Sequence, residues 1–330
     1  MIRKLVLLVF VVTAIGAAAL FWAVGTPAGG PNREVFVDIR PGTSSAAIAQ
    51  QLADAGVIDG TWRFMAARTL RSGVTLKAGE YRFERPLSAL EVLDKIARGD
   101  IFYHELRIPE GANIFDIAGH VEKLGLMPAA EFLKVARDPS LVKELSPDAP
   151  SLEGYLFPST YRVTRRTTAT QICREMTAQF RKVWQRIGGP GTDVNRYVTL
   201  ASMVEKETGV ADERTTVASV YANRLAIGMK LDADPTTLYA ALLEGRHRGP
   251  SIYKSDLEST HPYNTYRNPG LPPGPIANPG EASLKAALQP AKTNYLFFVA
   301  RGDRSGGHVF TETLERHNAA VRNYRDAIAQ

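Results

Sequence analysis

Residues Leu5 to Val24 form a continuous run of apolar or small side chains, broken only by the hydroxyl of Thr13. A helix of about 20 such residues spans the hydrocarbon core of a bilayer, and this run has that length. Arg3 and Lys4 precede it, and positive charge is typical of the cytoplasmic flank of a membrane span. The sequence therefore predicts a single-pass anchor in the cytoplasmic (inner) membrane, with residues 1–4 inside the cell and the rest exported.

A cleaved signal peptide is the alternative interpretation of the same run. Ala17, Ala18 and Ala19 are small residues of the kind found at cleavage sites. They lie inside the apolar run, however, and the run is long for a signal peptide, which favours an uncleaved anchor. The Gly- and Pro-rich residues 25–33 follow as a predicted linker. With either interpretation the folded part works outside the cytoplasm.

Composition narrows the classes of partner. The 330 residues carry a net charge of +6 with a pI of about 9.3, which suits an anionic polymer or a membrane surface. A long Lys/Arg run with interleaved aromatic residues is lacking, which argues against nucleic acid. The single cysteine, Cys173, excludes an intrachain disulfide and a cysteine-ligated zinc site. His308 and His317 match no helical zinc spacing, so neither a metal nor a cofactor is predicted.

Residues 34–112 predict a small α/β module. Alternating strands at 35–39 and 79–83 enclose amphipathic helices at 44–55 and 61–72. This strand–helix–helix–strand order resembles a LysM-like carbohydrate-binding module. Units with the same order occur in many proteins that bind no glycan, so both interpretations stay open.

The remaining residues 113–330 predict a mixed α+β domain. Residues 231–278 look loop-rich, although Asp234 before Pro235 is interpreted as the cap of a helix start. Two strands are expected to form a hairpin across a Gly-rich turn, at 296–300 and 308–311. Helices are expected over 114–124, 197–208, 212–225, 283–288 and 317–329.

Glu207 is the strongest candidate for chemistry. Leu200, Met203, Val204 and Glu207 recur at the spacing of the buried stripe of a helix, and Gly209 offers a stop. A carboxylate on that stripe loses hydration, so its pKa should rise toward the value that a general acid needs. Glu205 lies about 200° away around the helix and cannot point into the same cleft. The alternative interpretation is that Glu207 is an ordinary surface glutamate in a salt bridge.

A second signal is the run Pro262-Tyr263-Asn264-Thr265-Tyr266, which offers the amide, hydroxyl and stacking surfaces that sugar-binding sites use. It can equally be a well-packed loop held by tyrosine hydroxyls. Sequence signatures of a serine-hydrolase elbow, a P-loop and a dinucleotide-binding turn are lacking.

Together these motifs resemble the MltG/YceG-type endolytic murein transglycosylases. The run from Leu200 to Thr208 is similar to the catalytic motif of that family, and Lys206-Glu207-Thr208 and Tyr263-Asn264 are similar to motifs of lysozyme-like transglycosylases. Ser159 departs from the acidic residue expected in relatives. Further matching elements follow in the family's order: Leu152 to Pro158, Asn223 to Leu225, Asp234 to Thr236, Tyr263 to Tyr266, Gly270 to Ile276 and Gly306 to Phe310.

The resemblance implies an α+β protein with a transmembrane helix, a LysM-like module and a catalytic domain containing a lysozyme-like helix. It implies cleavage of the β-1,4 bond between N-acetylmuramic acid and N-acetylglucosamine within nascent glycan strands, ending elongation with 1,6-anhydro ends. Glu207 would act as acid and then as base, with Tyr263, Asn264, Tyr266 and Glu153 binding the substrate. Expected partners are peptidoglycan strands, the membrane and, as candidates, peptidoglycan synthases.

Two other functions stay open. A non-catalytic, membrane-anchored peptidoglycan-binding or scaffold protein would use the same charge and the same module. A muramidase would hydrolyse the same bond, with a product heavier by one water.

Overall fold

The computed structural model describes residues 2–27, 30–31, 33–246, 249 and 251–329. Position 1 of the predicted cytoplasmic segment and positions 28, 29 and 32 of the predicted linker lie outside the described residues, as do 247, 248 and 250 of the predicted loop-rich segment. The chain divides into two compact units. Unit 1 is Met1–His104 with Arg162–Arg165, and unit 2 is Glu105–Tyr161 with Arg166–Gln330.

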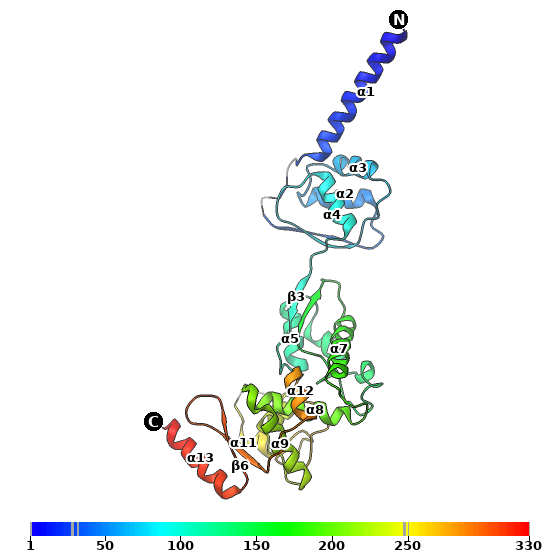
Figure 1. Ribbon diagram of the computed structural model, residues 1–330. Helices are drawn as coiled ribbons and strands as arrows, with labels where there is room; N and C mark the ends of the chain where they lie inside the picture. Colours follow the sequence, from blue (N-terminus) through cyan, green and yellow to red (C-terminus); the bar gives the residue numbers. More distant parts are fainter. Residues whose placement is uncertain (1, 28–29, 32, 247–248, 250, 330) are drawn as a thin grey trace. The chain divides into compact units, whose positions relative to one another are not determined.

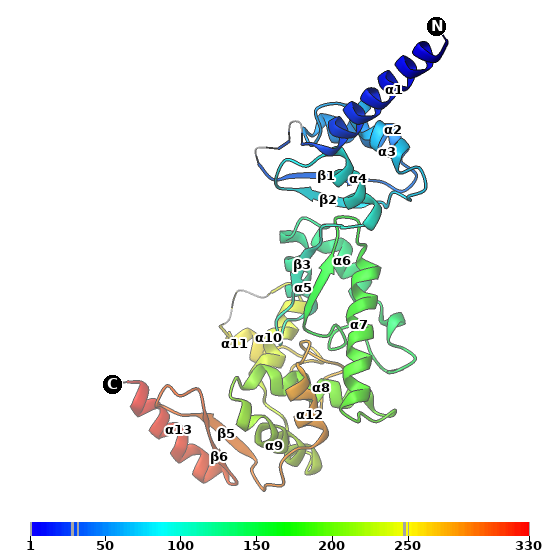
Figure 2. The ribbon, with the colours of Figure 1, turned by 45° about the horizontal axis from the view of Figure 1, so that its top comes forward.

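Unit 1 begins with α1 (Ile2–Gly25), which contains the predicted span 5–24 and is long and apolar enough to cross a membrane. Its last turn is attached to the folded part of the unit. Val24 is fully buried in the core of unit 1, and Arg63 Nη1 donates a hydrogen bond to the Ala23 carbonyl at 2.5 Å. Figures 1 and 2 show α1 ending against this unit.

The rest of unit 1 follows the predicted strand–helix–helix–strand order, with a further helix after it. Strands β1 and β2 pair antiparallel, from Val35 opposite Phe83 to Ile39 opposite Gly79. The alternate residues Val37, Ile39, Tyr81 and Phe83 face the core, where the helices bury Ile48, Leu52, Phe64, Leu93 and Ile96. The elements are β1 (Val35–Ile39), α2 (Ser45–Asp54), α3 (Thr61–Leu70), β2 (Gly79–Phe83) and α4 (Ala89–Arg98).

Unit 2 is built around α8 (Val194–Glu207), in which every residue from Val198 to Val204 is buried. Helices α9, α10 and α12 contact α8. The elements from the junction onward are β3 (His104–Arg107), α5 (Ile114–Lys123), α6 (Ala129–Ala136), η1 (Pro139–Leu141), β4 (Thr160–Val163), α7 (Ala169–Arg186), α8, η2 (Ala211–Glu213), α9 (Arg214–Ala226), α10 (Asp234–Leu243), α11 (Lys254–Glu258), α12 (Glu281–Leu288), β5 (Phe297–Ala300), β6 (His308–Thr311) and α13 (Leu314–Ile328).

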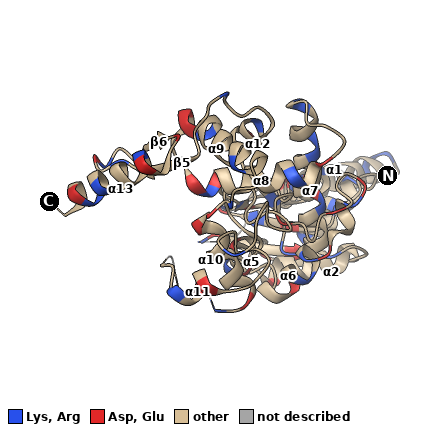
Figure 3. Cartoon of the chain, turned by 90° about the horizontal axis from the view of Figure 1, so that it is seen from below, with Lys and Arg blue, Asp and Glu red and all other residues tan. Residues whose placement is uncertain are grey.

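The predicted hairpin near the C-terminus is confirmed. Strands β5 and β6 pair antiparallel, from Phe297 opposite Thr311 to Ala300 opposite His308, and α13 packs against them. Within α13, all of which the structure describes, no residue is fully buried. Figure 3 shows basic and acidic segments along this helix, as expected for an outer, solvated element. The chain is therefore a mixed α+β protein with an N-terminal apolar helix.

The described part of residues 231–278 is loop-rich, as predicted, with the helices α10 and α11 inside it. Two local predictions are wrong. Asp234 is the first residue of α10 and not its cap; Ala233 takes the cap position without a side-chain hydrogen bond. Gly209 does not stop α8, because the chain already turns extended at Thr208, whose hydroxyl accepts a hydrogen bond from the Val210 amide at 3.0 Å.

Candidate active site

Glu207 is the last residue of α8, where the buried helix reaches a cavity of about 400 Å³. Its Oε1 accepts a hydrogen bond from the Tyr221 hydroxyl at 2.7 Å. Tyr221 is itself buried, in the middle of α9, with its ring edge-on to Phe298. The carboxyl group is therefore held in one orientation by a side chain that cannot move freely.

The surroundings of Glu207 favour its protonated form. Burial, as the largest cause, raises the pKa of Glu207 to about 7, and the negative charge of Asp234 acts in the same direction. The Tyr221 hydrogen bond and the positive charge of Arg224 oppose this increase. A carboxyl group with a pKa near neutrality can both donate and accept a proton at cellular pH.

The cavity collects side chains from six separate parts of unit 2. Three acidic residues, a basic residue, a histidine and two tyrosines supply polar groups, and the other lining residues are apolar or aromatic. The lining residues are Glu207, Tyr221, Arg224, Leu231, Asp232, Asp234, Tyr266, Phe297, Phe298, Leu314 and His317. A concave site with an apolar wall and a few convergent polar groups is typical of a ligand-binding site.

Arg224 joins the floor of the cavity to the segment before β5. Its Nε donates to the Leu296 carbonyl at 2.6 Å and its Nη1 to the Leu231 carbonyl at 2.8 Å, and its guanidinium lies over the Phe297 ring. The neighbouring Asn223 donates from Nδ2 to the carbonyls of Thr293 and Tyr295, both at 2.9 Å. Asn223 and Arg224 together therefore tie α9 to the segment before β5.

Asp234 and Tyr266 form another part of the cavity wall. The Tyr266 hydroxyl donates to Asp234 Oδ1 at 2.6 Å, so the carboxylate interacts with a cavity residue and not with the start of α10. Asp232 precedes it with a left-handed backbone, at φ 46°. The helix face that carries Glu207 has no second carboxylate. The cavity does contain further carboxylates, because Asp232 and Asp234 both line it.

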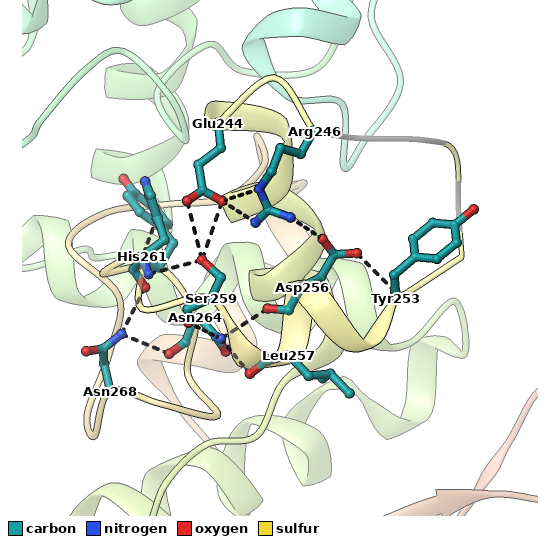
Figure 4. Close-up of polar contacts among 10 residues, drawn as sticks. Glu244, Arg246, Tyr253, Asp256, Leu257, Ser259, His261, Asn264 and Asn268 are labelled. Carbon is teal, nitrogen blue, oxygen red and sulfur yellow. Dashed lines mark hydrogen bonds and ion pairs between the residues drawn. The ribbon is translucent and has the colours of Figure 1, made fainter.

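Asn264 is the centre of a loop scaffold, as Figure 4 shows. Its Nδ2 donates to the carbonyls of Asp256, Leu257 and Ser259. Its Oδ1 accepts a hydrogen bond from the Tyr266 amide. The side chain is fully buried and does not line the cavity. Thr265 extends the scaffold, since its hydroxyl accepts from the Ala233 amide at 3.0 Å. These contacts position Tyr266, while substrate binding by Asn264 itself stays a prediction.

Tyr263 and Glu153 lie in a different cluster. Tyr263 packs against Tyr239, whose hydroxyl donates to Glu153 Oε2 at 2.9 Å. Glu153 also accepts from the Ile114 amide and from Asn278 Nδ2, and it is 1% exposed. Burial raises the pKa of Glu153 to about 8. Neither residue lines the Glu207 cavity, so their roles in substrate binding stay predictions.

Glu205 points away from Glu207, as the helix phase predicted. Its Oε2 accepts a hydrogen bond from the Gly280 amide at 2.9 Å, at the start of α12, whereas Glu207 faces α9. Of the residues selected from the sequence, the structure thus brings Glu207 and Tyr266 together.

Sequence reasoning missed most of the cavity wall. Tyr221, Asp232, Phe297, Phe298, Leu314 and His317 were not selected, and Asp234 was assigned a different role. Arg224 and Asp234 did lie inside family-like motifs, which was the available signal. Among the described residues, no group of three or more His, Cys, Asp or Glu side chains could hold a metal ion.

Comparison with known proteins defines the class. A sequence model of the YceG-like family matches residues 37–323. The chain belongs to the YceG-like family.

Particular relatives agree with this assignment. An endolytic murein transglycosylase of Bacillus subtilis is 33% identical over 310 residues, covering 88% of this chain and 84% of the relative. One of Streptococcus pneumoniae is 29% identical, covering 89% of this chain but 59% of that longer protein. The crystal structure of a yceG-like protein from Listeria monocytogenes is similar with a TM-score of 0.55 and 34% identity, covering 88% of this chain and 99% of the other.

Proposed function

We propose that the chain is an endolytic peptidoglycan lytic transglycosylase that cleaves the β-1,4 bond between N-acetylmuramic acid and N-acetylglucosamine within glycan strands. Its similarity to relatives named endolytic murein transglycosylases supports the reaction class. The single observation that carries the chemistry is Glu207, a carboxyl group with its pKa raised to about 7 and oriented by Tyr221 inside a cavity. No cofactor is part of this proposal.

The reaction uses Glu207 twice. As an acid it donates its proton to the glycosidic oxygen while the bond from the anomeric carbon to that oxygen breaks and positive charge develops on the muramic acid ring. As a carboxylate it then takes the proton of the sugar's C6 hydroxyl, whose oxygen bonds to the anomeric carbon. Glu207 ends protonated, and water is not consumed. Because acid–base action supplies about 10²–10⁴-fold, positioning and charge stabilisation must supply the rest of the acceleration.

Other polar groups of the cavity can stabilise the positive charge that develops on the muramic acid ring. Asp232 and Asp234 add negative charge to the cavity, and Tyr266 holds Asp234 in place. Negative charge next to an oxocarbenium-like centre lowers the energy of the transition state. Arg224 Nη1 lies 3.8 Å from Asp232 Oδ2 and offsets part of that negative charge, and Arg224 also fixes the segment before β5.

The same aspartates favour a second candidate function. Glycoside hydrolases commonly use a pair of carboxyl groups, one as acid and one as base or nucleophile. Since Asp232 and Asp234 share the cavity with Glu207, a muramidase that adds water across the same bond has the residues it needs.

The test is digestion of purified sacculi by the full chain, with the soluble products analysed by mass spectrometry. A transglycosylase yields 1,6-anhydro ends. A muramidase yields ends heavier by one water, and a scaffold protein that only binds yields no new ends. Only the first outcome supports the proposal.

Tyr221→Phe tests the control of Glu207. The hydroxyl of Tyr221 stabilises the carboxylate and so lowers its pKa; its removal should raise the pKa of Glu207 further. The alkaline limb of the pH–rate profile, where the acid loses its proton, should move up by about 1 pH unit, because a hydrogen bond to a charged group contributes about 1.5 kcal/mol and one unit corresponds to about 1.36 kcal/mol. An unmoved or lowered limb would contradict this role.

The finer assignments are also proposals. We assign α1 as a single-pass anchor in the cytoplasmic membrane, with the N-terminus in the cytoplasm and the chain after α1 outside. Residues 34–112 are a LysM-like module and 113–330 the catalytic domain, in which α8 is a lysozyme-like catalytic helix. The antiparallel β1–β2 pair enclosing α2 and α3 supports the module assignment. Peptidoglycan synthases are candidate partners that would place the enzyme at nascent strands and let it end their elongation.

A further inference from the structure

Helix α3 has an apolar outer face that the fold of unit 1 does not cover. Trp62 is 53% exposed, Met65 37% and Leu70 50%. Their spacing of three and eight residues places them on one side of the helix. The opposite side carries Phe64 and Ala67, which are fully buried in the core. A large indole and two aliphatic side chains in water are unfavourable unless something covers them.

The position of α3 in unit 1 indicates what covers this face. Helix α3 contacts the end of α1, where Val24 is buried in the core of the unit and Arg63 donates to the Ala23 carbonyl. Arg63 is itself held by Asp59, at 3.0 Å. The attachment is therefore direct, through the last turn of α1. A helix is about 10–12 Å across with its side chains, so an element touching the end of a membrane span lies within the headgroup layer or next to it.

The side chains on and around this face match a phospholipid surface. Tryptophan is enriched at the boundary between headgroups and acyl chains. Arg68 lies in the last turn of α3, where its Nη1 donates to the Arg71 and Ser72 carbonyls, which leaves its other N–H groups for a ligand. Arg71, at the end of α3, is more than half exposed and forms an ion pair with Asp94 of α4 at 3.8 Å. Guanidinium groups bind phosphate oxygens with two parallel hydrogen bonds, and an anionic leaflet attracts basic residues within a Debye length.

We propose that the outer face of α3, formed by Trp62, Met65 and Leu70 with Arg68 and Arg71, docks on the membrane that α1 spans. Trp62 inserts at the level of the glycerol backbone, and the arginines bind lipid phosphates. Unit 1 is then attached to the bilayer at two places, which fixes its orientation on the surface. The inference rests on the proposed membrane anchor.

The three tryptophans of the chain provide the experiment. Trp22 lies in α1, Trp62 on α3, and Trp184 is 2% exposed in the core of unit 2. The full chain is placed in nanodiscs of phosphatidylglycerol and phosphatidylethanolamine with brominated acyl chains, which quench nearby indoles. Trp22→Phe leaves Trp62 as the reporter, Trp62→Phe leaves Trp22, and the double variant measures the Trp184 background.

The proposal expects Trp62 to lose roughly half of its emission in brominated discs, because an interfacial side chain lies within about 5–10 Å of the acyl boundary. Trp22 should also be quenched, whereas the double variant should be unchanged. Quenching of Trp22 without Trp62 would overturn docking while leaving the anchor intact. Quenching of neither would overturn the anchor as well. Quenching of Trp62 by iodide in the buffer would also contradict the proposal, because it would place the side chain in water. Trp62 emission that neither reagent quenches would contradict it too, because a protein would then cover the side chain.

A charge substitution provides an independent test. Met65→Glu in the Trp22→Phe background introduces a carboxylate into the docking face, so quenching of Trp62 should fall to the background level. Tyr103→Glu is the matched control, because Tyr103 is 44% exposed in unit 1 but lies outside α3. Equal quenching in the two variants would overturn the proposal.

Discussion

Glu207→Gln should abolish the release of anhydromuropeptides from sacculi while leaving the protein folded. The glutamine amide still accepts the hydrogen bond from the Tyr221 hydroxyl, which is 2.7 Å from the carboxyl group in the native chain. It cannot donate a proton to a leaving oxygen, nor take one from a C6 hydroxyl. We expect a loss of about 10²–10⁴-fold in kcat/KM, the contribution typical of a general acid–base, with an unchanged unfolding midpoint.

Glu205→Gln is the matched control, two residues away on the same helix. Its side chain accepts a hydrogen bond from the Gly280 amide, and a glutamine oxygen can do the same. Activity should stay within a few-fold of the native value. Product release at the native rate by Glu207→Gln, or inactivity confined to Glu205→Gln, would contradict the assignment.

The second large effect concerns stability. Glu153 accepts hydrogen bonds from the Ile114 amide, the Tyr239 hydroxyl and Asn278 Nδ2, all within the buried interior of unit 2. Glu153→Leu leaves these three donors without their acceptor, so we expect a loss of about 3 kcal/mol or more in the free energy of unfolding. Fluorescence of Trp184, buried in the same unit, follows the transition in urea.

Two variants separate the role of Glu153 in stability from its predicted role in substrate binding. Glu131→Leu, at an exposed position on α6, is the control and should change stability by less than about 0.5 kcal/mol. Glu153→Gln keeps one acceptor oxygen and should lose less stability than Glu153→Leu. If Glu153→Gln instead raised KM with no change in unfolding, Glu153 would be a substrate-binding residue and the structural role would be wrong.

The buried carboxyl groups also set a pH dependence of stability. The pKa of Glu153 is about 8 in the folded chain, against an ordinary value of 4.5. The folded state therefore binds more protons than the unfolded state between these values, and stability should decrease as the pH rises through this window. In Glu153→Gln this part of the decrease should disappear, which urea titrations at several pH values would measure.

The sequence could predict those parts of the fold that depend on the local spacing of apolar and polar side chains. Strand alternation located β1 and β2, and helical periodicity located α5 and α8, because side-chain spacing alone decides which face is buried. The same periodicity separated Glu207 from Glu205. The start of α10 was located from Pro235, because Pro is well tolerated in a first helical turn, but the cap was placed at Asp234, one residue after the true cap Ala233.

The cavity wall could not be predicted in this way, because it depends on contacts between distant segments. Tyr221 is 14 residues from Glu207 in sequence, and Tyr266 is 32 from Asp234. Residues such as Phe297 and His317 enter the site only because β5 packs beside α9 and α13 packs on the β5–β6 hairpin. Asn264 shows the converse problem: its polar side chain suggested a ligand contact, but its hydrogen bonds are used inside the loop.

The central claim is cleavage without water by one glutamate, and the most direct test is digestion of glycan strands in ¹⁸O-labelled water. The attacking oxygen in the proposed reaction is the sugar's own C6 hydroxyl, so the muramic acid ends formed by the native chain should carry no label and should have the mass of the 1,6-anhydro form. Ends that are heavier by one labelled water would show that solvent attacks the anomeric carbon, with Asp232 or Asp234 as the second carboxylate, and would contradict the account.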